Sequence, residues 1–190
     1  MTRQSIDKDR PSKLMASIGI RQSGDPILHA VCDSFRLPDE AEEAQAVINQ
    51  LLTTATKAKE LHPFSKGIGL AAPQIGLPRA VAIAWMPQLE PLILLNPRTV
   101  DESIERDEQL EGCLSFFDVR GLVTRPLTIR VESSSLDGTV RQIVLDQGTA
   151  RLAAHEIDHL RGRLYVDRMS RDDDLVDVSR YDGSGSPWMY

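Results

Sequence analysis

Residues 147–161 read QGTARLAAHEIDHLR, and this stretch decides the fold because it predicts a helix with one long apolar face. Its apolar residues recur at intervals of three or four from Ala150 to Leu160, which is the spacing of a helical face. Gly162 follows directly, and glycine is common just beyond the end of a helix. A face of this length is expected to be buried against other elements of the protein.

The segments before this helix predict mostly strands. A first helix is predicted from Pro38–Glu40 to just before His62, because acidic residues open it and apolar residues then repeat at helical spacing. Short apolar runs bounded by prolines or by the turn signal Asp137-Gly138 predict strands at 80–85, 92–95, 127–132 and 140–145. Because the helices are not regularly interleaved with the strands, the predicted fold class is α+β.

The chain of 190 residues suits one domain with a sizeable core. Both ends are polar, so we expect an N-terminal tail over residues 1–16, a single folded domain over 17–170 and a polar C-terminal tail over 171–190. No apolar run is long enough to span a bilayer, and the first ten residues do not resemble a secretory signal, so a cytoplasmic location without membrane contact is expected. The net charge of −6 argues against direct nucleic-acid binding.

A metal site is indicated by His155 and His159, because residues four apart lie on the same face of a helix and can converge on one ion. Glu156 lies beside them and can reach a water at the metal without being a ligand, as in the metal-dependent hydrolases. A partly exposed polar helix face is the alternative interpretation. A catalytic site needs a third protein ligand. The candidates are Asp167, the acids of 172–174 and Cys113, which lies in the segment E-G-C-L-S.

A third motif is the glycine-spaced segment 67–76, GIGLAAPQIG, which by itself predicts a tight turn. Together with E-G-C-L-S at 111–115 and H-E-I-D-H at 155–159, it resembles the motifs of peptide deformylase, in the same order and at similar separations. The resemblance covers roughly residues 17–170, which would then form a single catalytic domain. It implies an α+β fold of mostly antiparallel sheets packed around a central metal-bearing helix.

The resemblance also implies an activity, a metal and a set of partners. The enzymes of this family hydrolyse the N-formyl group from the N-terminal methionine of new polypeptides and release formate. Cys113, His155 and His159 are the implied ligands of one divalent ion per chain, ferrous iron foremost, with zinc or nickel as alternatives. The implied partners are N-formylmethionyl peptides and, through a transient association, the ribosome.

The remaining roles carried over by motif concern the reaction and the substrate. Glu156 would transfer the proton, and the Gln74 side chain with the Leu114 backbone N–H would stabilise the developing oxyanion. The peptide would lie extended beside a strand edge near Gly69. Its methionine side chain would occupy an apolar pocket with walls formed by these candidates: Ile68, Leu152 and the aliphatic stem of Glu111.

Two positions depart from the family pattern. Ala154 stands where the family commonly has Gln, and Phe117 stands where it commonly has Pro. Phe117 is expected to reshape the rim of the substrate groove and leave the metal ligands untouched. Two alternatives stay open: a metallopeptidase of another type, which shares only the H-E-x-x-H motif, and an inactive deformylase-like metal-binding protein.

Overall fold

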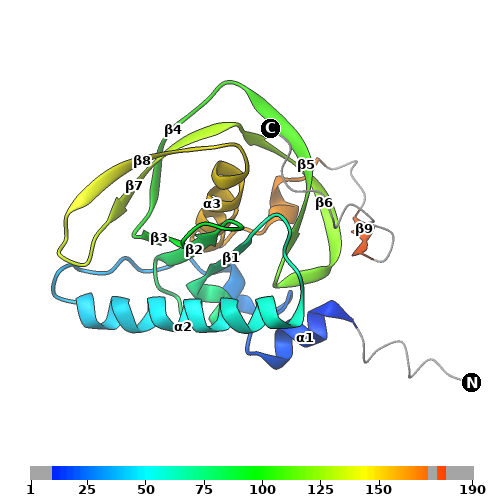
Figure 1. The fold of residues 1–190 in the computed structure, drawn as a ribbon, viewed down its shortest axis with the longest axis horizontal. Coiled ribbons are helices and arrows are strands. Elements are labelled where there is room, and N and C mark those ends of the chain that lie inside the picture. Colours follow the sequence, from blue (N-terminus) through cyan, green and yellow to red (C-terminus); the bar gives the residue numbers. More distant parts are fainter. Residues whose placement is uncertain (1–9, 171–174, 179–190) are drawn as a thin grey trace, which may run out of the picture.

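The computed structural model describes residues 10–170 and 175–178, and the fold that they form is drawn in Figure 1. The α-helices are α1 (Pro11–Ser17), α2 (Ala41–Leu61) and α3 (Gln147–Leu160), and the short 3-10 helices are η1 (Pro26–His29), η2 (Ala72–Ile75) and η3 (Tyr165–Arg168). The strands are β1 (Ile68–Ala71), β2 (Val81–Trp85), β3 (Leu92–Leu95), β4 (Arg98–Glu102), β5 (Arg106–Cys113), β6 (Phe116–Pro126), β7 (Thr128–Ser134), β8 (Val140–Asp146) and β9 (Val176–Asp177).

The strands form three antiparallel sheets of three strands each, in the orders β1-β2-β3, β4-β7-β8 and β5-β6-β9. Helix α3 lies among them and contacts β1, β2, β6, β7 and β8 (Figure 1). This arrangement confirms the predicted α+β class with antiparallel sheets around a central helix. None of the described helices is long and apolar enough to cross a membrane.

The central helix is buried because its apolar positions match the sheets around it. Ala150, Ala153 and Ile157 pack with Leu94 of β3 and Ile129 of β7 in one apolar cluster. Small side chains at 150 and 153 let the strands approach the helix closely, and the polar motif residues then project from the remaining surface of the same helix.

Helix α2 covers the other side of the β1-β2-β3 sheet and runs along one edge of the molecule (Figure 1). Glu42 and Glu43 lie in its first turn and Lys59 in its last, as the helix dipole favours. Its buried face is formed by Ala44, Val47, Ile48, Leu51, Ala55 and Ala58. The predicted first helix is therefore confirmed, and it begins at Ala41.

The strands at 81–85 and 92–95 and the hairpin around Asp137-Gly138 agree with the sequence patterns. Gly138 has a φ of +85°, a conformation that glycine adopts readily. The long hairpin β5-β6 was not predicted, because charged and polar residues interrupt its apolar alternation from Arg106 onwards. Beyond the pairing of its own two strands, the hairpin packs against β9 and α3. These are distant segments of the chain, and short-range patterns do not specify such contacts.

The boundaries of the folded part differ from the expected tails. Residues 11–17 form α1, in which Met15 is fully buried and the Ser12 backbone and hydroxyl both donate to Asp118 of β6. At the other end, Val176–Asp177 adds β9 to the edge of β6. One buried Met and a two-residue strand are too short to give a periodic signal. The rest of the expected tails, 1–9, 171–174 and 179–190, lies outside the described residues.

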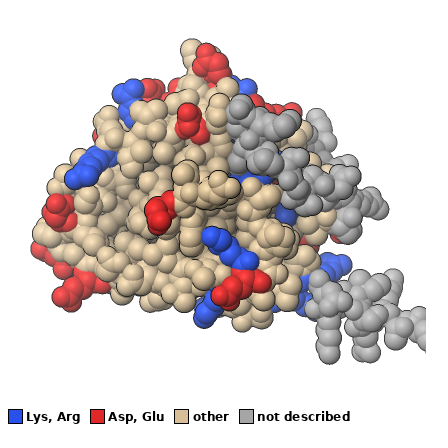
Figure 2. All heavy atoms as spheres, in the orientation of Figure 1, with Lys and Arg blue, Asp and Glu red and all other residues tan. Residues whose placement is uncertain are grey.

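Acidic and basic side chains are interspersed over the face drawn in Figure 2. Charged side chains also form ion pairs at the surface of the protein, among them Arg98 with Glu132 and Arg106 with Glu102. Such exposed pairs contribute little to stability. The charged groups that bear on function lie instead in the interior, around α3.

Candidate active site

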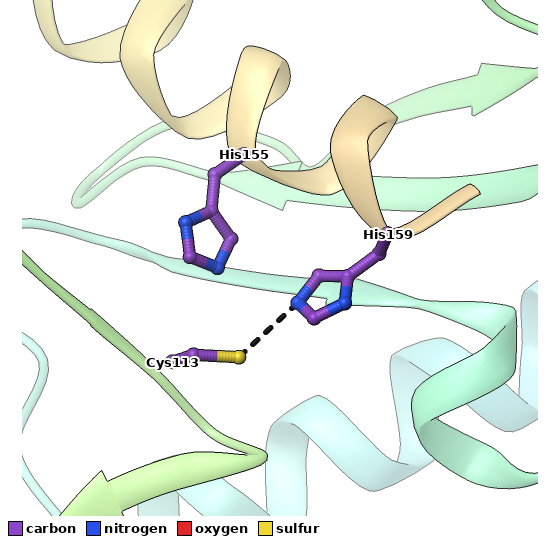
Figure 3. Close-up of side chains that lie close together, drawn as sticks. All are labelled: Cys113, His155 and His159. Atoms are coloured by element: carbon purple, nitrogen blue, oxygen red, sulfur yellow. Dashed lines mark hydrogen bonds between the residues drawn. The ribbon is translucent and has the colours of Figure 1, made fainter. Parts of the chain in front are cut away.

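Cys113, His155 and His159 converge on one point in the interior (Figure 3). All three are buried, and their ligand atoms lie within 4.8 Å of one another. The Cys113 Sγ is 3.1 Å from the His159 Nε2. Burial lowers the pKa of His159 well below its usual value, which keeps this imidazole neutral as a metal ligand must be. A thiolate with two imidazoles is a donor set that suits iron, zinc and similar divalent ions.

Local geometry explains why these three side chains meet. His155 and His159 are one helical turn apart on α3, so both rings point to the same side. The pairing of β5 with β6 is irregular between Glu111 and Cys113, and such a bulge can re-aim a side chain at the end of a strand. The Arg120 guanidinium lies over Gly112, where a Cβ would come within 2.5 Å of it, so a larger residue at this position would have to displace that side chain.

The other proposed ligands are not part of this group. The carboxylate of Asp167 accepts a hydrogen bond from the Leu164 backbone N–H at 2.8 Å. The acids at 172–174 lie outside the described residues. Within the part of the chain that the structure describes, Cys113 is therefore the third residue that the geometry brings to the histidines.

Gln74 is buried beside the thiol. Its Oε1 accepts a hydrogen bond from the Ala71 backbone N–H at 2.8 Å, which orients the amide. Its Nε2 then donates to the Cys113 Sγ at 3.4 Å and to the Ser115 Oγ at 3.2 Å. The Ser115 backbone N–H also donates to the Cys113 Sγ at 3.4 Å. These donors stabilise negative charge on sulfur, and they show that the glycine-spaced segment is part of the site.

Glu156 is almost completely buried, and its Oε2 has no hydrogen-bond partner in the structure. Burial raises its pKa to about 7, although the nearby charges of His155 and Arg125 act in the opposite direction. A carboxyl group with a pKa near neutrality can accept and return a proton with little cost. Glu156 also lines a cavity that Cys113 and His155 line as well, so a substrate can reach it.

Glu111 orients His155 through the ring nitrogen Nδ1. Its Oε2 lies 3.0 Å from the His155 Nδ1, and both of its oxygens accept hydrogen bonds from Arg125 at 2.9 Å. Burial would raise the pKa of Glu111, but the guanidinium of Arg125 holds it well below the usual range. Arg125 also donates to Asp158 of the H-E-I-D-H motif at 2.6 Å. Sequence reasoning missed this role of Arg125, since nothing in a local pattern pairs it with residues 111 and 158.

A cavity of about 360 Å³ opens onto Cys113 and His155 of the candidate metal site. The residues expected to bind substrate all line it: Ile68, Gly69, Glu111 and Leu152, together with Gln74 and Leu114. Ile68 and Gly69 come from β1, which is an edge strand, and Glu111 comes from β5, which is also an edge strand. The cavity therefore lies between two strand edges, and their backbone groups are available to an extended peptide.

Phe117 is buried in the wall of this cavity. Its ring contacts His62 edge-to-face with centroids 5.0 Å apart and Phe64 at 5.9 Å, and the Arg120 guanidinium lies 4.8 Å from its centroid. Phe117 was expected to reshape the rim of the substrate groove. In the structure it forms a cluster of aromatic rings with His62 and Phe64 in the cavity wall. His62 and Phe64 were not predicted here, because they belong to a loop that follows α2. Ala154 instead packs against the apolar cluster that contains Ile129.

Comparison with known proteins agrees with this geometry. The sequence profile of the polypeptide deformylase family matches residues 18–174. The chain is 36% identical over 154 residues to the peptide deformylase of Natranaerobius thermophilus, covering 81% of this chain and 93% of that protein. It is 38% identical over 153 residues to the peptide deformylase of Bartonella tribocorum, covering 77% and 81%. The crystal structure of the Thermotoga maritima peptide deformylase superposes with a TM-score of 0.69 at 30% identity, covering 80% of this chain and 96% of that one.

Proposed function

The chain belongs to the polypeptide deformylase family, and from this premise we propose that Cys113, His155 and His159 hold its catalytic metal ion. The enzyme hydrolyses the N-formyl group from the N-terminal methionine of new polypeptides and releases formate. The convergence of a thiol and two imidazoles at one wall of a cavity is the observation that supports the site most strongly.

The residues present fit a divalent ion. Three buried donors from β5 and α3 would hold the ion, and Cys113 and His155 among them line the cavity, so a substrate could reach it. An ion held there would polarise a carbonyl oxygen and make a bound water more acidic. We propose ferrous iron as this ion, with zinc or nickel as alternatives, because the same donor set binds all three.

Glu156 is proposed to carry the proton of the reaction. It would take a proton from the attacking water and then deliver it to the amine nitrogen as the formyl carbon–nitrogen bond breaks. Its raised pKa and its place in the cavity wall support both transfers. The buried Oε2, which has no partner in the structure, is the atom that is available for this exchange.

Gln74 and Leu114 are proposed to stabilise the negative charge that develops on the formyl oxygen. The Gln74 amide is oriented by the Ala71 backbone, and one of its two N–H groups, which donate to the Cys113 Sγ and the Ser115 Oγ in the structure, would turn to the charged oxygen. Leu114 follows Cys113 and is almost completely buried at the same wall of the cavity. Preorganised donors of this kind each contribute about 3 kcal/mol to the transition state in acyl-transfer enzymes.

The substrate is proposed to bind as an extended strand between β1 and β5. Backbone groups near Gly69 and Leu114 would pair with the peptide. The unbranched methionine side chain would then contact Ile68, Leu152 and the aliphatic stem of Glu111, all of which line the cavity. We propose that the enzyme meets such chains in the cytoplasm, in transient contact with the ribosome.

The direct test is formate release from a formyl-Met-Ala-Ser peptide under anaerobic conditions, with ferrous iron or zinc added to metal-free protein. We expect formate with the formylated peptide and no cleavage of the unformylated peptide. Cleavage of the internal peptide bonds would indicate a metallopeptidase of another type. Metal binding without formate release from either metal form would indicate an inactive homologue and overturn the proposed function.

A further inference from the structure

The carboxylate of Glu111 is hydrogen-bonded on all sides. Its Oε1 accepts from the Arg125 Nε at 2.9 Å and from the Arg151 Nη1 at 2.6 Å. Its Oε2 accepts from the Arg125 Nη2 at 2.9 Å and is 3.0 Å from the His155 Nδ1. An ionised carboxylate has about four acceptor positions, and all of them are used here.

This arrangement determines which nitrogen of His155 can bind a metal. Because Glu111 faces two guanidinium groups, it is a carboxylate that only accepts hydrogen bonds. The His155 Nδ1 must therefore carry the proton, and the lone pair remains on Nε2. A carboxylate that orients a metal-binding histidine in this way also makes it a stronger ligand.

Arg151 has a second set of contacts that Arg125 lacks. It lies on α3, one helical turn before His155, and its side chain is only 3% exposed. Besides Glu111, it donates to the Val123 carbonyl of β6 at 3.0 Å. It also donates to the Asp107 carboxylate of β5 at 2.7 Å and to the Asp107 carbonyl at 3.1 Å. One buried guanidinium thus joins the helix to both strands of the β5-β6 hairpin.

The two parts that Arg151 joins are the two parts that supply the ligands. Helix α3 carries both histidines, and the hairpin carries Cys113 at its bulge. The position of the thiol relative to the imidazoles therefore depends on how the hairpin is held against the helix. Metal affinity is sensitive to ligand placement, and contacts behind the ligands affect it strongly.

We propose that Arg151 is a positioning residue of the metal site, which holds the Cys113 hairpin against α3 and, through Glu111, orients His155 for the ion. The inference rests on the proposed metal site. Arg151 also lines the cavity, but in this role it acts on the metal site through Glu111 and the β5-β6 hairpin. A lysine at this position has one nitrogen and cannot bridge Glu111, Asp107 and Val123 with the same geometry.

Zn²⁺ affinity measured by chelator competition tests the proposal, with four variants beside the unchanged protein: Arg151→Met, Arg151→Lys, Asp107→Asn and Arg168→Met. Arg151→Met removes the whole contact set and keeps an unbranched apolar stem. Asp107→Asn weakens the contact between Arg151 and the side chain of residue 107 on β5, and it leaves the contact between Arg151 and Glu111. Arg168→Met is the matched control, because Arg168 donates to Asp158 at the far side of Arg125 and has no contact with Glu111. The thermal midpoint of each metal-free protein measures folding separately.

We expect Arg151→Met to weaken Zn²⁺ binding by about 10- to 100-fold, the range typical of residues that support metal ligands. Asp107→Asn should weaken it by less, Arg151→Lys should restore only part of the loss, and Arg168→Met should change it by less than about 3-fold. The visible spectrum of the Co²⁺ form should shift in Arg151→Met, because the thiolate and imidazole geometry changes, while KM for a formylated peptide stays the same.

Two outcomes would overturn the proposal. One is Zn²⁺ affinity and a Co²⁺ spectrum in Arg151→Met that match the unchanged protein. The other is a loss of affinity in Arg168→Met as large as that in Arg151→Met at equal thermal midpoints, because the effect would then be general destabilisation. Neither outcome depends on formate release, so failure of the proposed activity would be seen separately.

Discussion

Gly69 lies so close to Glu156 that a Cβ at position 69 would overlap the Glu156 Oε1. The backbone of β1 therefore forms one wall of the space in which the carboxylate lies. A side chain at position 69 would have to displace this carboxylate, so the close approach, and not the backbone conformation, favours glycine here. The edge strand that is proposed to bind the peptide and the residue that is proposed to carry the proton are thus in direct contact.

Replacing this glycine should separate catalysis from metal binding. In Gly69→Ala the new methyl group displaces the Glu156 carboxylate, so we expect kcat to fall by about 100-fold or more. Zinc content, measured by atomic absorption, should remain at one ion per chain because residue 69 does not contact the ligands. Activity within a few-fold of the unchanged protein would show that Glu156 does not need this position.

Removing the acid itself should abolish turnover with the metal still bound. Glu156→Gln keeps the shape of the side chain and cannot accept the proton, so we expect kcat for formyl-Met-Ala-Ser to fall by about 100- to 10,000-fold. Gln142→Glu on β8, an exposed change away from the cavity, is the control. Formate release by Glu156→Gln at the normal rate would exclude the proposed proton transfer.

The aromatic cluster should affect substrate choice more than the chemical step. Phe117→Leu keeps an apolar side chain but loses the contacts with the His62 and Phe64 rings, which widens one wall of the cavity. We expect KM for formyl-Met peptides with different second residues to change by unequal factors, with kcat altered by less than about 3-fold.

Steady-state kinetics with formyl-Met-Ala-Ser and formyl-Met-Phe-Ser would measure this difference. Replacing Leu89, an exposed residue of the loop after β2, by Ala provides a control for general effects of apolar truncation. Equal changes in KM for both peptides would show that Phe117 does not affect recognition of the second residue of the substrate.

The fold should lose a stabilising contribution in acid at Glu40. A hydrogen bond from the Arg36 backbone, with further bonds from the side chains of Arg79 and Arg36, lowers its pKa from 4.5 to about 2. A group with a lowered folded-state pKa stabilises the fold above its unfolded pKa, and the contribution is lost as the pH falls through the folded value. The loss should therefore develop between about pH 4.5 and 2.

Urea unfolding of the protein and of Glu40→Gln between pH 6 and 3 would measure this contribution. The free energy of unfolding should differ most at pH 6, and the two curves should converge towards pH 3. A constant difference across this range would show that Glu40 does not contribute through its charge.

Sequence patterns alone predicted the α+β class, the two helices that the structure shows as α2 and α3, and the hairpin at Gly138. They did so because helical repeats and turn residues act over a few positions, and the chain satisfies those preferences locally. The pair His155 and His159 could be recognised for the same reason, since one helical turn brings them together. Cys113 was one of several candidate ligands from the chemistry of its thiol, but only the resemblance to a family singled it out and gave Gln74 a role, because no local rule joins them to α3.

The networks behind the ligands were beyond local patterns. Arg151 lies four residues before His155, so its place on the same helix face could have been noticed, but its partners Glu111 and Asp107 could not. A buried charge needs partners of opposite sign wherever the fold brings them, and here both acidic partners come from β5, which is distant from α3 in the sequence. The same holds for Phe117, whose ring contacts come from the loop after α2.

The sequence by itself determined the helix that carries two of the proposed metal ligands and the proposed proton carrier, because a period of 3.6 residues places them on neighbouring positions of one surface. Only the tertiary structure decided where the thiol lies relative to them. The contact between Gly69 and Glu156 and the hydrogen bond from Arg151 to Glu111 join residues that are 40 or more positions apart, and the bulge before Cys113 re-aims the thiol at the end of β5. Such contacts depend on the packing of whole strands against α3, which is set by the burial of the entire core and not by any short stretch of the chain.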